Sequence, residues 1–177
     1  MIRPLAESDS IEELTLLLHA AYRALGEAGL NFCAVDQPVE RTRRRISKGP
    51  TFVAQEKAAG SLIGTVTLNL VKDVDDPPLY LRPDCASFGQ FGVHPEWQGK
   101  GIGSALHTWV KAAAVVNGVR WLALDTAKPA VHLIQLYEKW GYQIVGEHHW
   151  GGRTSYTSVL MQLDLHEACH LTAQHTS

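Results

Sequence analysis

The stretch that most restricts how this chain can fold is residues 90–104, where an apolar segment is followed by small residues and then by an amphipathic pattern. This order predicts a strand, a tight glycine turn and the start of a helix. The N–H groups of a first helical turn have no carbonyl partner within the helix, and they lie at the positive end of its dipole. The stretch therefore predicts a binding site for a phosphate group.

The spacing within this stretch argues against two common phosphate-binding fingerprints. A P-loop needs two glycines five apart with Lys and Ser or Thr directly after, and Lys100 does not stand in that context. The Rossmann dinucleotide fingerprint needs a third glycine, which is missing after Gly103. A nucleotide-binding domain is therefore the weakest hypothesis. The pattern that remains is Gln98-x-x-Gly101-x-Gly103.

That pattern, together with the preceding Val93-His94-Pro95, resembles the acetyl-coenzyme A motif of the GNAT superfamily of N-acetyltransferases. Residues 136–142, Leu-Tyr-Glu-Lys-Trp-Gly-Tyr, resemble the Leu-Tyr-Glu-Lys-x-Gly-Phe/Tyr signature of the same superfamily. The resemblance covers roughly residues 2–165. It implies acetyl-coenzyme A as the donor substrate and an acyltransferase that uses no metal.

Composition limits the other classes of function. A chain of 177 residues with 45% apolar residues is the size of one ordinary domain, so we expect a GNAT-like domain over residues 1–165 and a tail over 166–177. A net charge of −2 gives no positive field for nucleic acid or an acidic membrane. Three widely spaced cysteines favour a reducing compartment. With no signal peptide or apolar span of roughly 20 residues, we expect a cytoplasmic protein.

Hydrophobic periodicity and turn signals predict a single α/β domain of the α+β type, in the order β-α-α-β-β-β-α-β-α-β-β. It should contain about seven mostly antiparallel strands and four helices. The fourth and fifth strands should be parallel, because a helix connects them. The resemblance implies that they part at the cofactor site. The expected strands are 2–5, 51–55, 62–71, 85–93, 121–124, 142–150 and 154–163; the expected helices start at Ile11, Pro38 and Ile102 and cover 133–140; residues 72–84 should form an exposed loop, and 151–153 a three-residue hairpin turn.

The donor would be bound mainly by backbone groups. Gly92 within a strand predicts a bulge or a close backbone approach, with simple close packing as the alternative. The resemblance implies that the backbone of Phe91 and Val93 binds the pantetheine arm and that the Val93 N–H approaches the thioester oxygen. The residues expected to face the diphosphate are Gln98, Gly99, Lys100, Gly101, Ile102, Gly103 and Ser104, with the Lys100 ammonium at the rim.

Tyr137 is the candidate general acid, since the resemblance places this tyrosine at the coenzyme sulfur. A phenol of pKa about 10 can donate to a thiolate whose conjugate acid has a pKa of about 8.5. A base acting through water is expected at Asp125 or His132, although each is also explained as a capping or buried residue. Two positions depart from the family pattern: Gln90, where some relatives carry an acid, and Ala130, where an asparagine is common.

The acceptor is expected to be a small-molecule or peptide amine. Aromatic side chains in its pocket would stack on an apolar or cationic group. The second hypothesis is a coenzyme-binding sensor that lost turnover, motivated by Gln90 and Ala130. The exposed edge of the last hairpin also permits a homodimer. The residues expected to line the acceptor pocket are Tyr22, Asn31, Phe32, Trp150 and Tyr156.

Three further groups of residues have a functional and a simpler interpretation. Cys33 or Cys85 as an acyl carrier is a weak competitor to direct transfer. The arginines of 41–45 are either an anion site or a solvated helix face. We expect no metal site in the tail, because a polar terminus is usually frayed, although it contains His166, Cys169, His170 and His175.

Overall fold

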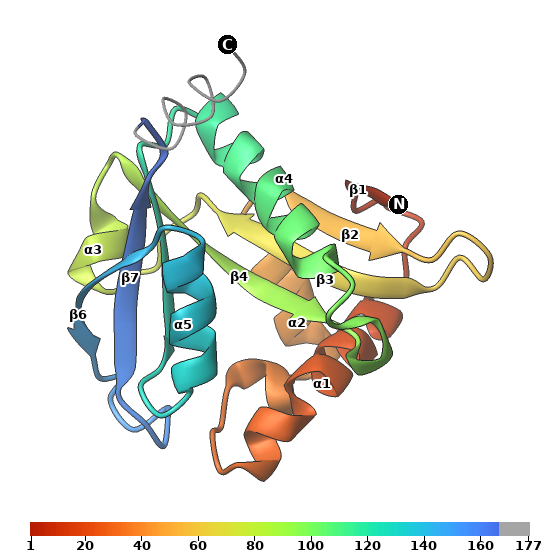
Figure 1. The fold of residues 1–177 in the computed structure, drawn as a ribbon, viewed down its shortest axis with the longest axis horizontal. Coiled ribbons are helices and arrows are strands. Elements are labelled where there is room, and N and C mark those ends of the chain that lie inside the picture. The colour runs from red at the N-terminus through yellow and green to blue at the C-terminus, as the bar shows by residue number, and fades with distance from the viewer. Residues whose placement is uncertain (167–177) are drawn as a thin grey trace. The chain divides into compact units, whose positions relative to one another are not determined.

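The computed structural model describes residues 1–166, and seven strands form one mixed sheet in the order β1-β2-β3-β4-β5-β7-β6 (Figure 1). The strands are β1 (Ile2–Pro4), β2 (Thr51–Gln55), β3 (Leu62–Asn69), β4 (Cys85–Val93), β5 (Trp121–Ala127), β6 (Gln143–His148) and β7 (Ser158–Asp164). The helices are α1 (Ile11–Glu27), α2 (Val39–Ile46), α3 (Pro78–Leu81), α4 (Ile102–Val116) and α5 (Val131–Lys139), with 3-10 turns at Cys33–Val35 and Pro95–Trp97.

The predicted fold class is confirmed, with β4 and β5 running parallel from Cys85 opposite Trp121 to Ser87 opposite Ala123. The described residues contain one α-helix more than the four predicted, because α3 lies in the Asp- and Pro-rich segment that was expected to be an exposed loop. That prediction was wrong because Tyr80 is buried, at 7% exposure, and packs with Cys85 and Ala123. A buried aromatic fixes the segment around it.

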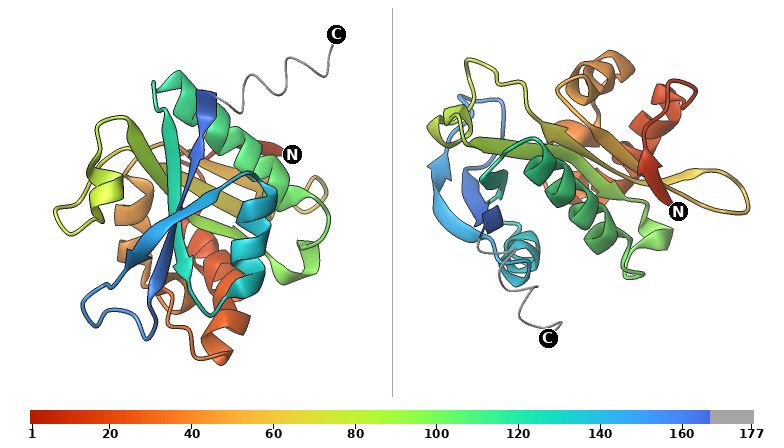
Figure 2. Two further views of the ribbon diagram at one scale, coloured as in Figure 1. Left: turned by 60° about the vertical axis from the view of Figure 1, so that its left-hand side comes forward. Right: turned by 90° about the horizontal axis from the view of Figure 1, so that it is seen from above.

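Packing divides the described residues into two compact units, residues 1–71 with 88–113, and residues 72–87 with 114–166. In the first unit, α1 and α2 cover one face of the strands and the start of α4 covers the other (Figures 1 and 2). On the α1 face, Leu14 and Leu17 pack against Val53 and Leu62. On the opposite face, Phe52 contacts Trp109 of α4, with ring centroids 5.4 Å apart.

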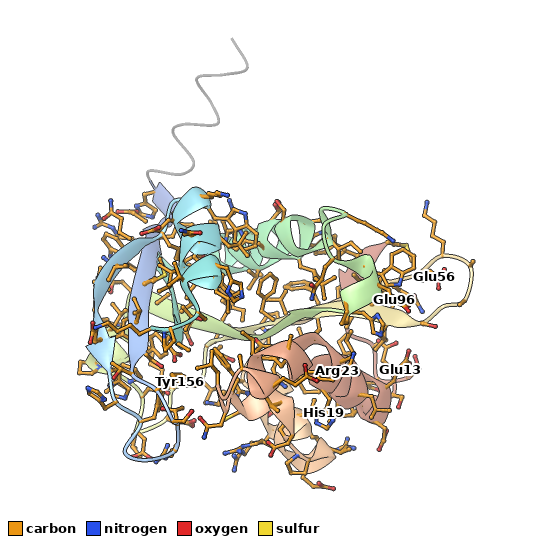
Figure 3. The ribbon with its side chains drawn as sticks, turned by 60° about the horizontal axis from the view of Figure 1, so that its bottom comes forward. Glu13, His19, Arg23, Glu56, Glu96 and Tyr156 are labelled. Atoms are coloured by element: carbon orange, nitrogen blue, oxygen red, sulfur yellow. The ribbon has the colours of Figure 1, made fainter. Side chains whose placement is uncertain are left out.

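α1 starts at Ile11, as predicted, and Ser10 is its N-cap. The Ser10 hydroxyl oxygen accepts a hydrogen bond from the Glu13 N–H at 3.1 Å, which satisfies one free donor of the first turn. The Glu13 carboxylate does not return the bond to Ser10 but accepts one from the Leu62 N–H at 2.8 Å. This bond joins the helix to β3. Glu13 projects from α1 together with His19 and Arg23 (Figure 3).

In the second unit, β7 pairs antiparallel with both β5 and β6. Gly141, at φ 90°, follows the C-cap of α5, and a β-carbon there would lie 3.3 Å from Leu163. Leu163 pairs with Leu122, whereas Ala123, which packs with Tyr80 of α3, pairs with Gln162. Because neighbouring residues of a strand face opposite sides, α5 and α3 cover opposite faces.

Several strand ends differ from the prediction, and β1 ends at Pro4 rather than at residue 5. β3 ends at Asn69 rather than at residue 71, and β5 continues to Ala127 rather than ending at residue 124. The last two strands are shorter than expected, so residues 149–157 connect them in place of a three-residue turn. Gly151 and Gly152 do adopt positive φ, of 59° and 82°. Trp150, before them, lies outside the β6 and β7 pairing, and its indole N–H donates to Asp125. No helix within residues 1–166 is both long and apolar enough to cross a bilayer.

Candidate functional site

The predicted phosphate cradle follows β4 in the first unit. The His94 N–H donates to the Ile63 carbonyl at 2.9 Å, and a 3-10 turn over Pro95–Trp97 then leads into the glycine loop. The Gln98 side-chain amide donates to the Val93 carbonyl at 3.1 Å, so the first residue of the motif ties the loop back to the end of the strand. This bond explains why a long amide side chain suits that position.

Gly99 and Gly101 hold the loop in a conformation that other residues rarely adopt. Their φ angles are 73° and 79°, and a β-carbon at either position would meet no atom within 4 Å. Glycine is therefore needed here for backbone conformation rather than for space. The Ala105 N–H donates to the Gly101 carbonyl at 3.0 Å and closes the first turn of α4. The N–H groups that precede it have no carbonyl one turn earlier in the helix, as an anion site requires.

Two further residues of the motif have contacts of their own. Gly103 lies within α4, and a β-carbon there would be 3.6 Å from the Phe91 ring and 3.8 Å from Val93, which are ordinary contact distances. The Lys100 ammonium lies 4.5 Å from the centre of the Trp97 ring, as a cation–π pair. The cation expected at the rim therefore rests on an indole within the same loop.

β4 contains a bulge, but at Gly89–Gln90 rather than at Gly92. Phe88 and Phe91 contact each other, with ring centroids 5.7 Å apart, although residues three apart on a regular strand face opposite sides. Between them, a β-carbon on Gly89 would lie 3.3 Å from Arg45 of α2, and Gln90 has a φ of 49°. Gly89 and Gln90 thus both face the α1 and α2 side, where a regular strand would place only one residue. The strand therefore contains one extra residue, which is a bulge.

Gly92 serves the close packing that was the alternative explanation. A β-carbon there would lie 2.9 Å from the Ala21 β-carbon and 3.6 Å from the Tyr22 ring, so glycine lets α1 approach the strand. The Tyr22 hydroxyl donates to the Phe91 carbonyl at 2.9 Å, and its ring meets Phe32 edge-on with centroids 5.6 Å apart. Two of the predicted acceptor residues are therefore in contact with each other; Asn31, next in sequence to Phe32, is exposed.

Gln90 belongs to a buried polar chain. Its side-chain oxygen accepts a hydrogen bond from the Gln37 amide at 3.3 Å, and that amide also donates to the Thr42 hydroxyl at 2.8 Å. Gln90 and Gln37 are 3% and 1% exposed. The Gln90 amide nitrogen and the Gln37 amide oxygen find no hydrogen-bond partner among the described residues. The Gln90 amide cannot act as a base.

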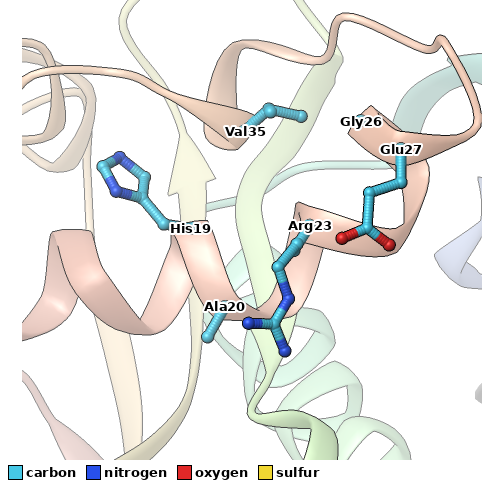
Figure 4. A pocket seen from close by; sticks show the side chains of 6 residues that line it. All are labelled: His19, Ala20, Arg23, Gly26, Glu27 and Val35. Atoms are coloured by element: carbon cyan, nitrogen blue, oxygen red, sulfur yellow. The ribbon is translucent and has the colours of Figure 1, made fainter.

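A shallow concavity on the same unit contains none of the predicted site residues. It is lined by α1 and by the segment after it, with Arg23 and Glu27 on one rim (Figure 4). His19 lies in it, and a ring nitrogen of this histidine lies 2.8 Å from the Gln37 carbonyl oxygen. His19 therefore contacts the backbone of Gln37, whose side chain donates a hydrogen bond to Gln90. Its lining residues are His19, Ala20, Arg23, Gly26, Glu27 and Val35.

In the second unit, the Asp125 carboxylate accepts three hydrogen bonds. One oxygen accepts from the Tyr80 hydroxyl at 3.0 Å, and the other from the Ser158 hydroxyl at 2.8 Å and the Trp150 indole N–H at 3.2 Å. Burial, with the neighbouring charge of Asp125, raises the pKa of Tyr80 well above its ordinary value, so this phenol stays a neutral donor. Sequence patterns missed both Tyr80 and Ser158, since neither belongs to a motif.

Tyr137 lies in an aromatic cluster on α5. It is 8% exposed, and its ring meets those of Trp140 and Tyr142 edge-on, with centroids 5.8 and 6.0 Å apart. Burial raises the pKa of Tyr142 well above its ordinary value. His132, the other candidate base, is exposed in the first turn of α5. Ala130 is the N-cap of this helix and provides no side-chain hydrogen bond to it.

The remaining candidates are less suited to chemistry. Burial raises the pKa of Cys85 to about 11, so its thiol is protonated near neutral pH and is a poor acyl carrier. Cys33 is half-buried, and Tyr156 is half-buried in the loop before β7. Within residues 1–166, no cluster of three or more His, Cys, Asp or Glu side chains is arranged to hold a metal. The tail residues Cys169, His170 and His175 lie outside the described residues.

Comparison with known proteins identifies the family of this chain. Two proteins of Bacillus subtilis (strain 168) are similar to it: S-(2-succino)cysteine N-acetyltransferase, 28% identical over 149 residues (83% of this chain, 87% of that protein), and S-alkylcysteine N-acetyltransferase, 22% identical over 151 residues (84% and 82%). A GNAT family acetyltransferase from Elizabethkingia anophelis, solved with acetyl-CoA bound, has a similar fold, with a TM-score of 0.63, 18% identity and coverage of 93% and 97%. The family model for the acetyltransferase (GNAT) family matches residues 11–142, and the chain therefore belongs to that family of acyltransferases.

Proposed function

We propose that this protein transfers the acetyl group of acetyl-coenzyme A directly to a primary amine, within a ternary complex of enzyme, donor and acceptor. The observation that carries the proposal is the cradle after β4, where Gly99 and Gly101 take positive φ angles and the first turn of α4 presents unpaired N–H groups. That arrangement suits a diphosphate. The similar structure with bound acetyl-CoA supports the same donor.

In this proposal the backbone of residues 98–104 binds the diphosphate, and the backbone of Phe91 and Val93 binds the pantetheine arm. The Val93 N–H stabilises the negative charge that develops on the thioester oxygen. The amine nitrogen forms the new amide bond as the carbon–sulfur bond breaks. Tyr137 then gives its hydroxyl proton to the departing thiolate and regains one from solvent.

The proton that the amine loses goes to water or to a base. Asp125 and His132 are the candidates. His132 is exposed, in the first turn of α5. Asp125 already accepts three hydrogen bonds, so a bridging water would have to share its oxygens with those donors. Amines of low pKa contain enough neutral form to react without a strong base.

We infer that the acceptor is the α-amine of an S-substituted cysteine. Both similar proteins of Bacillus subtilis are named for acceptors of this class, and each similarity extends over more than four fifths of this chain. The aromatic residues proposed for the acceptor pocket, Tyr22, Phe32, Trp150 and Tyr156, suit the apolar thioether arm of such a substrate, and Asn31 can bind its polar end.

The test is release of free coenzyme A thiol from acetyl-CoA with a panel of amines. The panel contains S-methylcysteine, S-(2-succino)cysteine, alanine, polyamines, an aminoglycoside and a peptide N-terminus. We expect turnover with the two S-substituted cysteines and little with the polyamines. Turnover that prefers another amine class would refute the acceptor assignment but not the acetyltransferase activity.

The competing function is a coenzyme-binding sensor of the same fold. It is favoured by Gln90, which cannot act as a base, and by Ala130, which gives α5 no side-chain cap. Titration calorimetry with acetyl-CoA, run beside the thiol assay, separates the two functions. Tight binding of acetyl-CoA without thiol release for any amine would favour the sensor, whereas thiol release excludes it.

A further inference from the structure

Three segments of the second unit meet at one carboxylate. Asp125 lies on β5, and its hydrogen-bond donors come from α3 (Tyr80), from the loop 149–157 (Trp150) and from β7 (Ser158). None of these donors is close to Asp125 in sequence. The carboxylate therefore fixes the position of two segments that contain little regular structure, the one around α3 and the one before β7.

The indole of Trp150 is held from more than one side. Its N–H is shared between Asp125 and the Ser158 hydroxyl, each at 3.2 Å, and the His148 ring meets it edge-on with centroids 4.7 Å apart. An indole N–H can only donate, so it needs an oxygen acceptor to be held in one orientation. The residue is only half-buried, so part of the ring stays accessible.

A second contact joins the same two segments. Arg153, three residues after Trp150, donates to the Asp75 carboxylate at 2.6 Å. Both side chains are well exposed, at 59% and 62%, so this ion pair contributes little by itself. It is a second link between the segment before α3 and the loop that contains Trp150.

The position of this cluster suits a substrate site. Ala123 pairs with Ser87 where β4 and β5 run parallel, and Asp125 follows two residues later toward the carboxyl end of β5. In sheets with parallel strands, ligands bind beyond the carboxyl ends of those strands.

We propose that Asp125 is a positioning residue that holds the Trp150 indole as a fixed wall for the apolar side chain of the acceptor amine. This inference rests on the proposed acetyltransferase function and specifies how its acceptor is selected. A ring that is already ordered loses less conformational entropy on binding than a mobile one. The geometry therefore assigns selectivity for the side chain to Trp150, and its orientation to Asp125.

The test compares two amino-acid acceptors that share the reacting amine, alanine and S-benzylcysteine. The measured quantity is the kcat/KM for S-benzylcysteine divided by the kcat/KM for alanine. We expect Trp150→Ala and Asp125→Ala to lower this ratio about tenfold, which is the size expected for a few apolar contacts. The change should come from a higher KM for S-benzylcysteine. Trp150→Phe keeps a ring but removes the N–H, and should fall between these variants and the wild type.

Asp125→Asn distinguishes positioning from base catalysis. The amide oxygen, placed where Oδ2 is now, can still accept from the indole and from the Ser158 hydroxyl, while the amide nitrogen takes the place of Oδ1 and donates to the Tyr80 hydroxyl oxygen. A positioning role therefore predicts that Asp125→Asn keeps most of the ratio and the wild-type pH profile of kcat. Loss of kcat in this variant, with a displaced pH profile, would overturn the proposal in favour of a base.

Asp164→Asn is the matched control, because Asp164 pairs with Trp121 at the opposite end of the same β5 and β7 ladder and binds Arg120. Its ratio should equal that of the wild type. An unchanged ratio in Trp150→Ala would refute the inference while leaving the acetyltransferase activity intact.

If the wild type acetylates no amine, the proposed function fails, but the inference can still be decided. Calorimetry then measures the binding of S-benzylcysteine to wild type, Trp150→Ala and Trp150→Phe in the presence of coenzyme A. Equal binding, or none to any of the three, would overturn it.

Discussion

The two glycines of the cradle predict opposite effects of the same substitution. Gly101 has a φ of 79° with open space beside it, whereas Gly103 lies in α4 with room for a β-carbon at 3.6 Å from Phe91. Gly101→Ala should destabilise the protein because alanine is strained in the left-handed region. Gly103→Ala should stabilise it, because alanine favours the helix and meets only ordinary contacts.

The magnitudes follow from these conformations. A left-handed residue with a β-carbon costs about 1–2 kcal/mol, and the smaller entropy of unfolded alanine offsets about 0.4–1 kcal/mol of that, which leaves Gly101→Ala about 1 kcal/mol less stable. Gly103→Ala should gain about 0.5–1 kcal/mol. The two variants should therefore differ by about 2 kcal/mol, or roughly 4–8 °C in Tm for a chain of this size.

Urea unfolding measures the difference in the free energy of unfolding between the two variants. Titration calorimetry measures the Kd of coenzyme A for each of them. If the Gly101 backbone relaxes, at least one N–H bond to a phosphate is lost. A bond to a charged group contributes about 1.5–3 kcal/mol, so the Kd should rise at least tenfold. Gly103→Ala should bind as the wild type does. Equal stability and equal coenzyme affinity of the two variants would refute the assignment of the cradle.

Three further predictions concern residues outside the cradle. Tyr137→Phe should lower kcat by about 10²-fold or more and leave the Kd of coenzyme A unchanged; an unchanged kcat would remove Tyr137 from the acid role. Burial, with a smaller effect of Lys111, lowers the pKa of His107 from 6.5 to about 3, so the unfolded state binds more protons between these values and stability falls as the pH drops from about 6.5 toward 3. His107→Phe should flatten that dependence in urea unfolding at several pH values, and an identical slope would contradict the burial argument. Gly92→Ala places a β-carbon 2.9 Å from Ala21 and should cost about 1–3 kcal/mol in the free energy of unfolding; a neutral effect would mean that α1 moves freely.

Elements with local signals were predictable from the sequence. Ser10 is the N-cap of α1, Gly141 follows the C-cap of α5, and the bounds of β2 and β4 are as expected, because caps, glycines and alternation act over a few residues. The short helix α3 was missed because its stability comes from Tyr80 packing on residues of other segments. No local pattern contains that information.

The same distinction applies to the site. The backbone conformation of the glycine loop could be predicted, because it belongs to consecutive residues whose spacing the sequence specifies; its binding of a diphosphate stays a prediction. The bonds around Asp125 could not, because Tyr80, Trp150 and Ser158 approach it from separate parts of the chain. Trp150 was expected at the acceptor on general aromatic grounds, but its orientation depends on those partners.

The bulge in β4 means that this strand has one residue more than its packing requires. If Gly89 were deleted, Phe88, Phe91, Gly92 and Val93 would keep the faces they occupy now, because the two bulged residues already act as one in the alternation. The deletion would straighten the strand and remove the turn in direction that aims the backbone between Phe91 and Val93. A shortened chain that folds but binds coenzyme A weakly in calorimetry would show that the extra residue is retained for the donor substrate rather than for the core.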